Sequence, residues 1–281
     1  AGVFHLNGIG ADAAFGAKGI HRVSAFELNA NVLGVIYATG FVMAVARVIQ
    51  PRTGLGTFRR LLFAGAGAVC MMGLVMTGSR TAAVFASLGS IILIAIEMRR
   101  ARWSLSAIMA VLLVIGGAWG VFAADSVFGE RSERVVTSGL ASEDRARMAP
   151  VLMDQFLRSP IYGLGPENYR VELGERSHTG EPGVGIVAHN QLFMFAVEMG
   201  LFGLIPFLAI CFLLLLHAWR VRVEDDGGLP LALALPCVLT ACTVANIAFH
   251  WHFHFIVGLV AAAYGAHRAA TKDPAPSGGG P

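Results

Sequence analysis

Long, mostly apolar stretches separated by short polar connections constrain the fold of this chain more than any other feature. They occupy residues 31–48, 61–76, 81–98, 104–123, 190–217, 229–249 and 252–267. A helix needs about 20 such residues to cross the hydrocarbon core of a membrane, whereas barrel strands would give short alternating segments. Only 14% of the residues are charged, against roughly 25% in soluble domains. We therefore expect an all-α protein, a polytopic transmembrane helix bundle with about seven spans.

The same pattern divides the chain into four parts. Residues 1–123 hold an N-terminal external segment and transmembrane helices, and residues 189–268 hold the C-terminal transmembrane helices. Between them, residues 124–188 are hydrophilic and too long for a simple turn, so we expect a partly helical external loop subdomain. The tail 269–281 is rich in Gly and Pro and should be disordered. Because the chain begins AGVFHLNGIG without an initiator Met, we expect it to be the C-terminal portion of a longer protein.

Basic residues in the short connections predict the orientation in the membrane. Taking alternate connections as cytoplasmic places eleven basic residues on that side, against Lys18, Arg22 and Arg80 on the other. Cytoplasmic loops carry an excess of Lys and Arg, while long loops are translocated largely regardless of charge. The hydrophilic segment is therefore expected on the outer face, which is the periplasm in a cell with an outer membrane.

The net charge and the positions of the cysteines and histidines argue against nucleic-acid binding and against a metal site. A net charge of +3 without a Lys/Arg-rich run argues against a nucleic-acid partner. The four cysteines lie within apolar stretches and lack metal-site spacing, so we interpret them as packing residues. His250, His252 and His254 gather at an expected outer membrane boundary beside aromatic residues, which favours an interfacial belt over a metal centre. The sequence thus predicts neither a metal nor a cofactor.

Arg80 closes a four-residue break, Thr77-Gly78-Ser79-Arg80, between two apolar stretches at the expected outer face. An arginine near membrane depth costs up to roughly 2.5–3.5 kcal/mol on insertion scales. One interpretation is an anchor whose side chain extends to the interface. The other is a fixed cation for the phosphates of a lipid-linked substrate, because guanidinium N–H groups pair with phosphate oxygens.

The hydrophilic segment contains seven arginines, no lysine and ten acidic residues, so its net charge is −3. It is not a general basic patch for anionic lipids. Phosphate binding there would depend on individual arginines, whose forked donors match phosphate oxygens.

Residues 142–160 predict a helix in this segment, with Ser142 as an N-cap candidate. At 100° per residue, Arg145 and Leu152 lie within about 20° of the same face, and Arg147 lies nearly opposite. Arg145 should therefore point inward with the apolar stripe, while Arg147 faces solvent. An inward arginine has two interpretations, a structural pair with a carboxylate or a ligand for substrate phosphate.

His189 and Asn190 stand where the outer segment meets the next apolar stretch. Asn is a favoured N-cap, so Asn190 should begin the helix and His189 should lie just ahead of its first turn. A histidine there is held rigidly yet faces water, which suits proton transfer at a lipid-linked substrate. The alternative is that these polar residues merely mark the start of a membrane helix.

Two neighbouring features have structural interpretations. The run SPIYGLGPENYR should turn on Gly163 and Gly165. Glu198 is a carboxylate inside an apolar stretch, which is a functional candidate by default. It lies nine residues after His189 and so about 180° around the helix. We therefore expect Glu198 to bond to a neighbouring helix rather than to act with His189.

Several short motifs occur in a fixed order along the chain. They are Arg22 with Asn29-Ala30-Asn31, Thr77-Gly78-Ser79-Arg80, Asp144-Arg145, Ser159-Pro160-Ile161-Tyr162-Gly163-Leu164-Gly165, Ala188-His189-Asn190, and Glu198-Met199-Gly200 with Gly203. In order and spacing, over roughly residues 22–219, they resemble the bacterial O-antigen ligase and O-antigen polymerase superfamily. Two departures are Thr81, where Gly is common, and Ala30, where Pro is common. They affect local turn geometry more than chemistry.

The resemblance implies a GT-C-like, metal-independent glycosyltransferase of the bacterial inner membrane with a periplasmic active site. Its donor would be a glycan on a polyprenyl diphosphate, and its acceptor a hydroxyl of the lipid A–core or of another glycan. Leaving phosphates gain negative charge, which fixed cations stabilise, and Arg80 and Arg145 are the catalytic candidates for that role. A neutral His189 would act as the base, and the reaction would invert the anomeric centre. Further candidates for substrate binding are Arg22, Asn190, Arg147 and Tyr162.

The resemblance favours an O-antigen ligase, with a polymerase that uses the same kind of donor as the closest alternative. A transporter of lipid-linked sugar ranks third, because transporters usually place polar residues near the midplane in repeated halves. A purely structural membrane subunit ranks fourth. All four classes share membrane lipids as partners.

Overall fold

The computed structural model describes residues 30–49, 56–100, 116, 140–177, 188, 190–223, 228–241 and 251–272. Helices account for most of this part of the chain, and it contains no strand. The helices are α2 (Ala30–Ile49), α3 (Thr57–Thr77), α4 (Arg80–Arg100), α7 (Leu140–Arg158), α8 (Arg170–Ser177), α9 (Gln191–Val221), α10 (Gly228–Ala241) and α11 (Trp251–Lys272). The predicted all-α class is confirmed.

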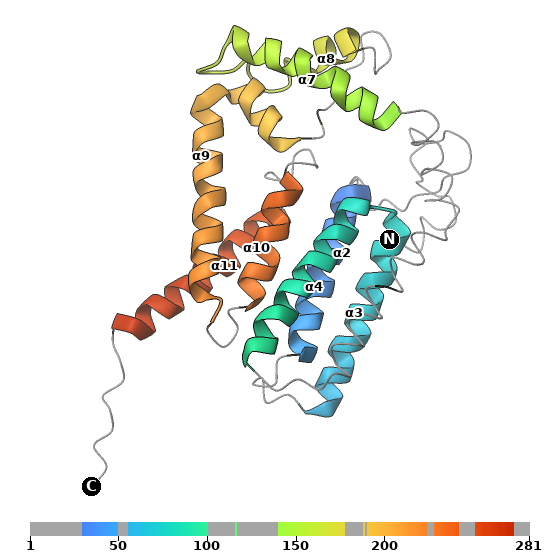
Figure 1. Cartoon of the computed structure of the whole chain (residues 1–281), viewed down its shortest axis with the longest axis vertical. Helices are drawn as coiled ribbons and strands as arrows, with labels where there is room; N and C mark the ends of the chain where they lie inside the picture. Colours follow the sequence, from blue (N-terminus) through green and yellow to red (C-terminus); the bar gives the residue numbers. More distant parts are fainter. Residues whose placement is uncertain are drawn as a thin grey trace.

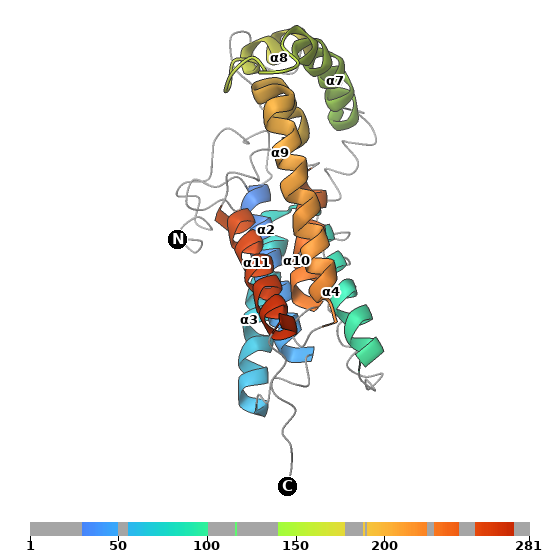
Figure 2. The same ribbon diagram turned by 90° about the vertical axis from the view of Figure 1, so that its left-hand side faces the viewer.

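One apolar bundle contains all the helices except α7 and α8 (Figures 1 and 2). Within it, α2 packs against α3 and α4, α4 packs against α10, and α10 and α11 pack against α9. Small residues allow these close approaches, because apolar side chains gain little by leaving lipid and backbones must come near each other. Gly34 in α2 illustrates the point, since a Cβ there would lie 2.9 Å from the Cβ atoms of both Ser79 and Ala82.

Four helices are long and apolar enough to cross a membrane, within the residues that the structure describes. They are α2, α3, α4 and α9, and they match the predicted spans at 31–48, 61–76, 81–98 and 190–217. The exposed face of α3 carries large apolar side chains such as Leu61, Val69 and Met72, which suits contact with lipid. The fourth predicted span, 104–123, lies outside the described residues except for Gly116.

The last two predicted spans are helices, but neither is among the four membrane-crossing candidates. α10 has 14 residues, fewer than the hydrocarbon core requires, and residues 242–249 of that predicted span lie outside the described part. α11 has 22 residues, but His252, His254, His267 and Arg268 interrupt its apolar character.

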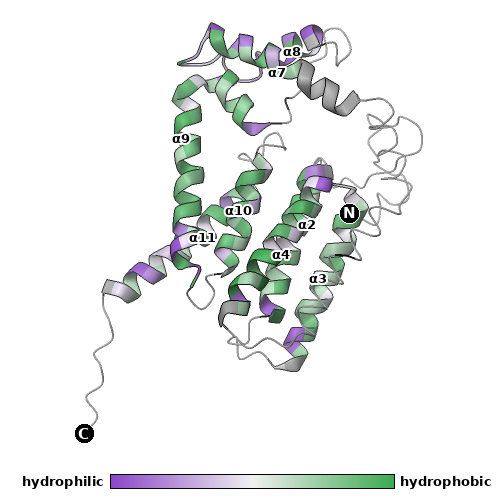
Figure 3. Cartoon of the chain, viewed as in Figure 1, coloured by the Kyte–Doolittle hydropathy of each residue, from purple (hydrophilic) through white to green (hydrophobic). Residues whose placement is uncertain are grey.

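The two ends of the bundle differ in charge. The end where α2 stops, α3 starts, α4 stops and α9 stops carries the arginines Arg47, Arg59, Arg60, Arg99, Arg100, Arg220 and Arg222. The helices α7 and α8 lie at the opposite end, together with the junction between α3 and α4 (Figure 1). In Figure 3 the coloured parts of α7 and α8 mix hydrophilic and hydrophobic residues, whereas the helices of the bundle are mostly hydrophobic. The directions of the described helices therefore agree with the alternation predicted from the basic residues.

Candidate functional site

The junction between α3 and α4 fixes the position of Arg80. Gly78 ends α3 in the left-handed conformation at φ 60°, and its N–H donates to the carbonyl of Val75. Ser79 caps α4, because its Oγ accepts from the N–H of Ala82 at 3.3 Å. Thr77 and Ser79 are buried, whereas Arg80 is exposed as the first residue of α4. The junction thus presents one guanidinium on a rigid support.

The distribution of charge at the α3–α4 junction favours the binding of an anion. A helix N-terminus carries partial positive charge, so a cation there opposes the helix dipole. α4 places Arg80 at that end and has no acidic residue in its first turn. Exposed N–H groups and a cation at a helix start form a common binding arrangement for phosphate. The geometry does not decide between the phosphate and membrane-anchor interpretations of Arg80, and its role stays a prediction.

The predicted loop helix exists as α7, which continues past Pro150 to Arg158. It begins at Leu140, two residues before Ser142, so the prediction of Ser142 as its N-cap was wrong. The predicted apolar stripe is confirmed by Leu152, which is buried in a small core together with Tyr169, Leu173 and Met194. Arg145 and Arg147 lie in α7, but their side chains lie outside the described part of the chain. Their predicted directions stay predictions.

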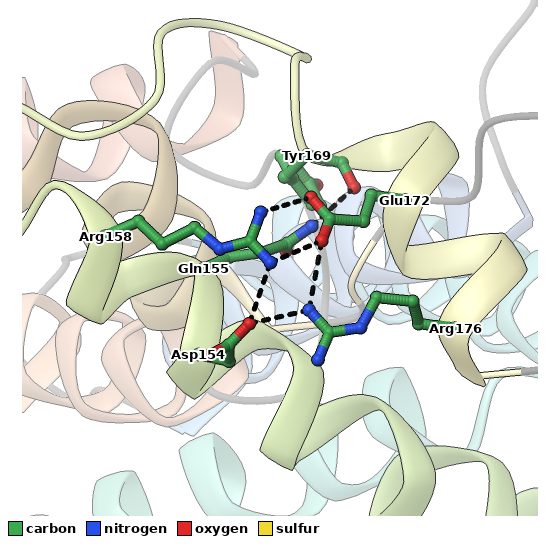
Figure 4. A network of polar contacts seen from close by, with 6 residues as sticks. All are labelled: Asp154, Gln155, Arg158, Tyr169, Glu172 and Arg176. Carbon is green, nitrogen blue, oxygen red and sulfur yellow. Dashed lines mark hydrogen bonds and ion pairs between the residues drawn. The ribbon is translucent and has the colours of Figure 1, made fainter.

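Ion pairs join α7 to α8 (Figure 4). Arg158 contacts Asp154 at 2.9 Å and Glu172 at 2.8 Å, while Arg176 contacts the same carboxylates at 2.6 and 3.0 Å. Hydrogen bonds from Arg176 and Arg158 hold the pKa of Asp154 below its usual range. Burial raises the pKa of Glu172, but hydrogen bonds from Gln155, Arg176 and Arg158 outweigh that effect and lower it.

These ion pairs reduce the number of arginines in residues 124–188 that are candidates for binding substrate phosphate. Arg158 and Arg176 are held by carboxylates, and Arg170 pairs with Glu167 at 2.9 Å. An arginine already paired in this way binds substrate phosphate less readily, because its partner must first be displaced. Three of the seven arginines therefore have structural roles that their sequence pattern did not reveal, and Arg145 and Arg147 remain the candidates in α7.

The helix α9 is broken at Gly200, where the backbone adopts φ 63° and ψ −159° (Figure 1). The break leaves backbone groups without helical partners, and residues 160–165 supply them. Leu164 and Gly165 donate to the carbonyls of Val197 and Glu198 at 2.8 and 2.9 Å. In return, Leu201 and Phe202 donate to the carbonyls of Pro160 and Ile161 at 2.8 and 3.0 Å. We call these four hydrogen bonds the clasp.

Two glycines make the clasp possible. A Cβ on Gly200 would lie 2.4 Å from the carbonyl oxygen of Ile161, and one on Gly163 would lie 2.3 Å from that of Glu198. Both residues have positive φ, and Gly165 has φ 88°, which confirms the turn predicted on Gly163 and Gly165. The SPIYGLG and EMG motifs, more than thirty residues apart in sequence, are therefore two sides of one contact.

Glu198 adds a side-chain bond to the clasp. Its carboxylate accepts from the backbone N–H of Glu167 at 3.1 Å. Glu167 itself has φ 63°, an uncommon conformation for a residue other than glycine, and this bond helps to hold it. The prediction of a structural role is consistent with this geometry. The partner, however, is the connection between α7 and α8 rather than a neighbouring helix.

Asn190 caps α9 as predicted. Its Oδ1 accepts from the N–H groups of Leu192 at 2.9 Å and Phe193 at 3.3 Å, and its backbone is extended. Ala188, on the other side of His189, is buried in the small core under α7 and α8. His189 itself lies outside the described residues, as does Arg22. The chain on both sides of His189 is thus anchored by packing and by the cap.

Two residues near this anchor were missed by the sequence reasoning. Tyr169 is fully buried, and its hydroxyl makes no well-formed hydrogen bond within the described residues. Burial raises the pKa of Tyr169 to about 12, an effect that the nearby backbone of Ala188 opposes. Gln155, also fully buried, donates to the carbonyl of Tyr169 at 3.2 Å. The only indication in the sequence was that Tyr169 lies at the end of the glycine-rich run SPIYGLGPENYR.

Tyr162, a predicted binding residue, lies at the tip of the clasp. It is 76% exposed, and its ring centroid lies 6.5 Å from that of Phe202, which is 73% exposed. An exposed aromatic pair suits contact with sugar rings or lipid. Its role in binding stays a prediction.

The histidines of α11 do not share a face. His252 is buried and His254 is exposed, as two residues of separation on a helix require, while His250 lies outside the described residues. Among the described residues there is no group of three His, Cys, Asp or Glu side chains able to hold a metal ion.

The apolar bundle, the arginine at a helix junction and the polar helices clasped to a broken span define a helical membrane protein with a structured polar region at one end. A family model described as O-antigen ligase matches residues 61–208, more than half of the 281-residue chain. The chain therefore belongs to the O-antigen ligase family. The match contains the α3–α4 junction, α7, α8, the clasp and the cap of α9. A search of the curated proteins finds no match.

Proposed function

We propose that this protein is an O-antigen ligase of the bacterial inner membrane, with its active site on the periplasmic face. It transfers a polysaccharide from a polyprenyl diphosphate carrier to a hydroxyl of the lipid A–core acceptor. The reaction is metal-independent and inverts the anomeric centre. Membership of the family supports ligase or polymerase chemistry in general, and the residue roles below are our own assignment.

One observation carries this proposal. The α3–α4 junction that bears Arg80, the helix α7 that contains Arg145 and the capped start of α9 beside His189 all lie toward the same end of the bundle (Figure 1). That end is opposite the arginine-rich end, and the positive-inside rule assigns it to the periplasm. A membrane-borne donor with two phosphates could reach all three elements from the lipid.

The break in α9 supports this placement. As one straight helix, α9 would extend about 46 Å at 1.5 Å per residue, well beyond a hydrocarbon core of about 30 Å. Residues 201–221 alone extend about 31 Å, which matches the core. The part of α9 before Gly200 then lies at the outer interface, so that Asn190 and the adjacent His189 meet the donor headgroup where water is accessible.

In the proposed reaction, the acceptor hydroxyl attacks the anomeric carbon of the lipid-linked sugar. The bond from that carbon to the phosphate oxygen breaks, and its electron pair remains on the diphosphate. Arg80 and Arg145 stabilise this charge, while neutral His189 accepts the proton of the hydroxyl. Arg22, Arg147, Asn190 and Tyr162 contribute to substrate binding. Because Oδ1 of Asn190 already caps α9, its amide N–H groups are the atoms that contact substrate.

Lipopolysaccharide from a deletion strain tests the proposal. Bare lipid A–core with polysaccharide retained on the carrier lipid, restored to a ladder by the wild-type gene, is the expected result on a gel. Core that bears single repeats would instead assign the chain as a polymerase, the alternative with the same kind of donor. An unchanged ladder would contradict both functions and leave a transporter or structural subunit.

A further inference from the structure

The exposed apolar side of α9 continues onto the polar end of the molecule. Phe202, Ile205 and Phe212 of α9 are exposed, and their spacing places them within about 80° of one another around the helix. At the clasp, the N–H of Phe202 donates to the carbonyl of Ile161 at 3.0 Å, and the ring centroid of Tyr162 lies 6.5 Å from that of Phe202. Ile161 and Tyr162 are themselves 56% and 76% exposed. The exposed surface of a membrane span thus extends onto the connection between α7 and α8.

The last two turns of α7 extend the same surface. Leu157 lies four residues before Ile161, and Met153 lies four residues before Leu157, so they follow one another along one side of the helix. Leu157 is 64% exposed and Met153 is 48% exposed. We define the apolar band as the exposed side chains of Met153, Leu157, Ile161, Tyr162 and Phe202.

The apolar band occupies a third side of α7. Leu152 is buried in the small core, while Asp154 and Arg158 form the ion pairs with α8. At 100° per residue, Leu157 lies about 140° from Leu152, and Met153 lies about 100° from it. A helix packed on one side and facing water on the others carries polar residues on its outer sides. Exposed apolar patches of this kind mark contacts with proteins or membranes.

The position of the apolar band identifies the membrane as its partner. α9 is long and apolar enough to cross a membrane, and residues 201–221 extend about 31 Å, so that Phe202 lies at one boundary of the hydrocarbon core. Ile161 and Tyr162 contact Phe202 and therefore lie near the same depth. The helix α7 crosses the end of the bundle, with its C-terminal end beside the start of this span (Figures 1 and 2). Interfacial helices adopt this orientation.

The contact is apolar rather than electrostatic. Arg158 and Arg176, the arginines at the packed sides of α7 and α8, are paired with Asp154 and Glu172. Residues 124–188 carry a net charge of −3, so anionic lipids gain no advantage at this surface. Aliphatic side chains suit acyl chains instead, and tyrosine rings are enriched at the boundary with the headgroups.

We propose that the apolar band lies in the acyl-chain region of the leaflet on this side of the membrane. The end of α7 is an interfacial helix, with Met153 and Leu157 below the headgroups and its ion pairs toward water. The clasp fixes this helix to α9 at a constant depth. A membrane-borne substrate would approach Tyr162 through the same leaflet, which is compatible with its proposed role in binding. The inference rests on α9 crossing the membrane and not on the transferase function.

Collisions of spin labels with paramagnetic reagents test the proposal in membranes. A variant whose four cysteines are replaced with alanine receives one label through Leu157→Cys or Ile161→Cys and is reconstituted in phosphatidylcholine vesicles. Oxygen concentrates among acyl chains, whereas a nickel chelate stays in water. Two reference labels calibrate the scale, at Glu175→Cys on the exposed side of α8 and at Phe212→Cys within the span.

The labels at 157 and 161 should collide with oxygen about as often as the label at 212. They should collide with nickel at least about fivefold less often than the label at 175, because interfacial helices bury their apolar face about 5–10 Å deep. Nickel collisions as frequent as those at 175 would place the band in water and overturn the proposal. Rare collisions with both reagents would show that protein covers the band, from a second copy or another segment, and would also overturn it.

Two further comparisons exclude electrostatic attachment and general damage. Collision rates should be the same in phosphatidylglycerol vesicles and at high salt, and a rise in nickel collisions at high salt would contradict an apolar contact. Each labelled variant is first shown to be monodisperse and to melt within a few degrees of the unlabelled protein. Should Ile161→Cys fail this criterion, Tyr162→Cys takes its place, because that side chain is the most exposed of the band.

Discussion

Replacing Gly200 with Ala should open the clasp, because the structure leaves no room for a Cβ there. The added atom would lie 2.4 Å from the carbonyl oxygen of Ile161 and 2.7 Å from the nitrogen of Gly163. In addition, φ 63° with ψ −159° belongs to a region essentially restricted to glycine, where other residues cost about 1–3 kcal/mol. If Ile161 moves away, the four clasp hydrogen bonds weaken, and each contributes about 0.5–1.5 kcal/mol.

The lower limits are about 1 kcal/mol for the backbone strain and about 0.5 kcal/mol for each of the four hydrogen bonds, which together give about 3 kcal/mol. This free energy corresponds to more than about a hundredfold change in the equilibrium between the closed and the open clasp. Hydrogen exchange measures that equilibrium at the N–H groups of Leu164, Gly165, Leu201 and Phe202, which make the clasp. We expect their exchange to accelerate by about that factor in Gly200→Ala.

Gly65→Ala is the matched control. A Cβ on Gly65 meets nothing within 4 Å, and alanine favours a helix over glycine by about 1 kcal/mol. This variant should leave exchange in the clasp unchanged. If Gly200→Ala also leaves those four amides as protected as in the wild type, the reasoning from the broken helix and its glycines is refuted.

Three further predictions concern the cap, the buried tyrosine and the junction. Asn190→Ala should weaken the start of α9 by about 1 kcal/mol and speed exchange of the Leu192 amide, whereas Asn190→Asp should preserve the cap; equal exchange in both variants would contradict its role. Because the folded pKa of Tyr169 is raised to about 12 from an ordinary 10, its contribution to stability is complete below pH 10 and is lost as the pH rises toward 12. In Tyr169→Phe, the amides of α8 should therefore lose less of their protection from hydrogen exchange between about pH 10 and about pH 12 than they do in the wild type. An equal loss in the two proteins would contradict this prediction. Arg80→Lys keeps the charge but loses the fork, so the transfer rate should fall at least about tenfold, and near-full activity would exclude a forked phosphate contact.

The sequence reasoning succeeded where local pattern and membrane length decide the outcome. The lengths of the apolar stretches predicted the spans that the structure shows as α2, α3, α4 and α9. The N-cap preference of asparagine predicted that α9 starts at Asn190. Helical periodicity identified the buried face of α7 that contains Leu152. In each case the signal lies within a few turns of one helix, so neighbours elsewhere in the chain do not alter it.

The break at Gly200 could not be predicted in the same way. Residues 191–221 are mostly apolar, and although Gly200, Gly203 and Pro206 lie among them, none of these residues by itself shows where the helix breaks. The break is stabilised by backbone groups of residues 160–165, which are remote in sequence. The ion pairs that join Arg158 to Glu172 and Arg176 to Asp154 were missed for the same reason, since they depend on how α7 and α8 pack. Contacts between distant segments carry this information, and a single sequence does not display them.

The most direct test of the account is glycan transfer by the protein in liposomes with a lipid-linked donor and a lipid A–core acceptor. His189→Asn removes the proposed base while retaining a polar side chain of similar size, and Arg80 and Arg145 remain to hold the diphosphate. We predict that this variant binds the donor about as well as the wild type and transfers no detectable glycan. Transfer at a rate near that of the wild type would contradict the proposed chemistry at this end of the bundle.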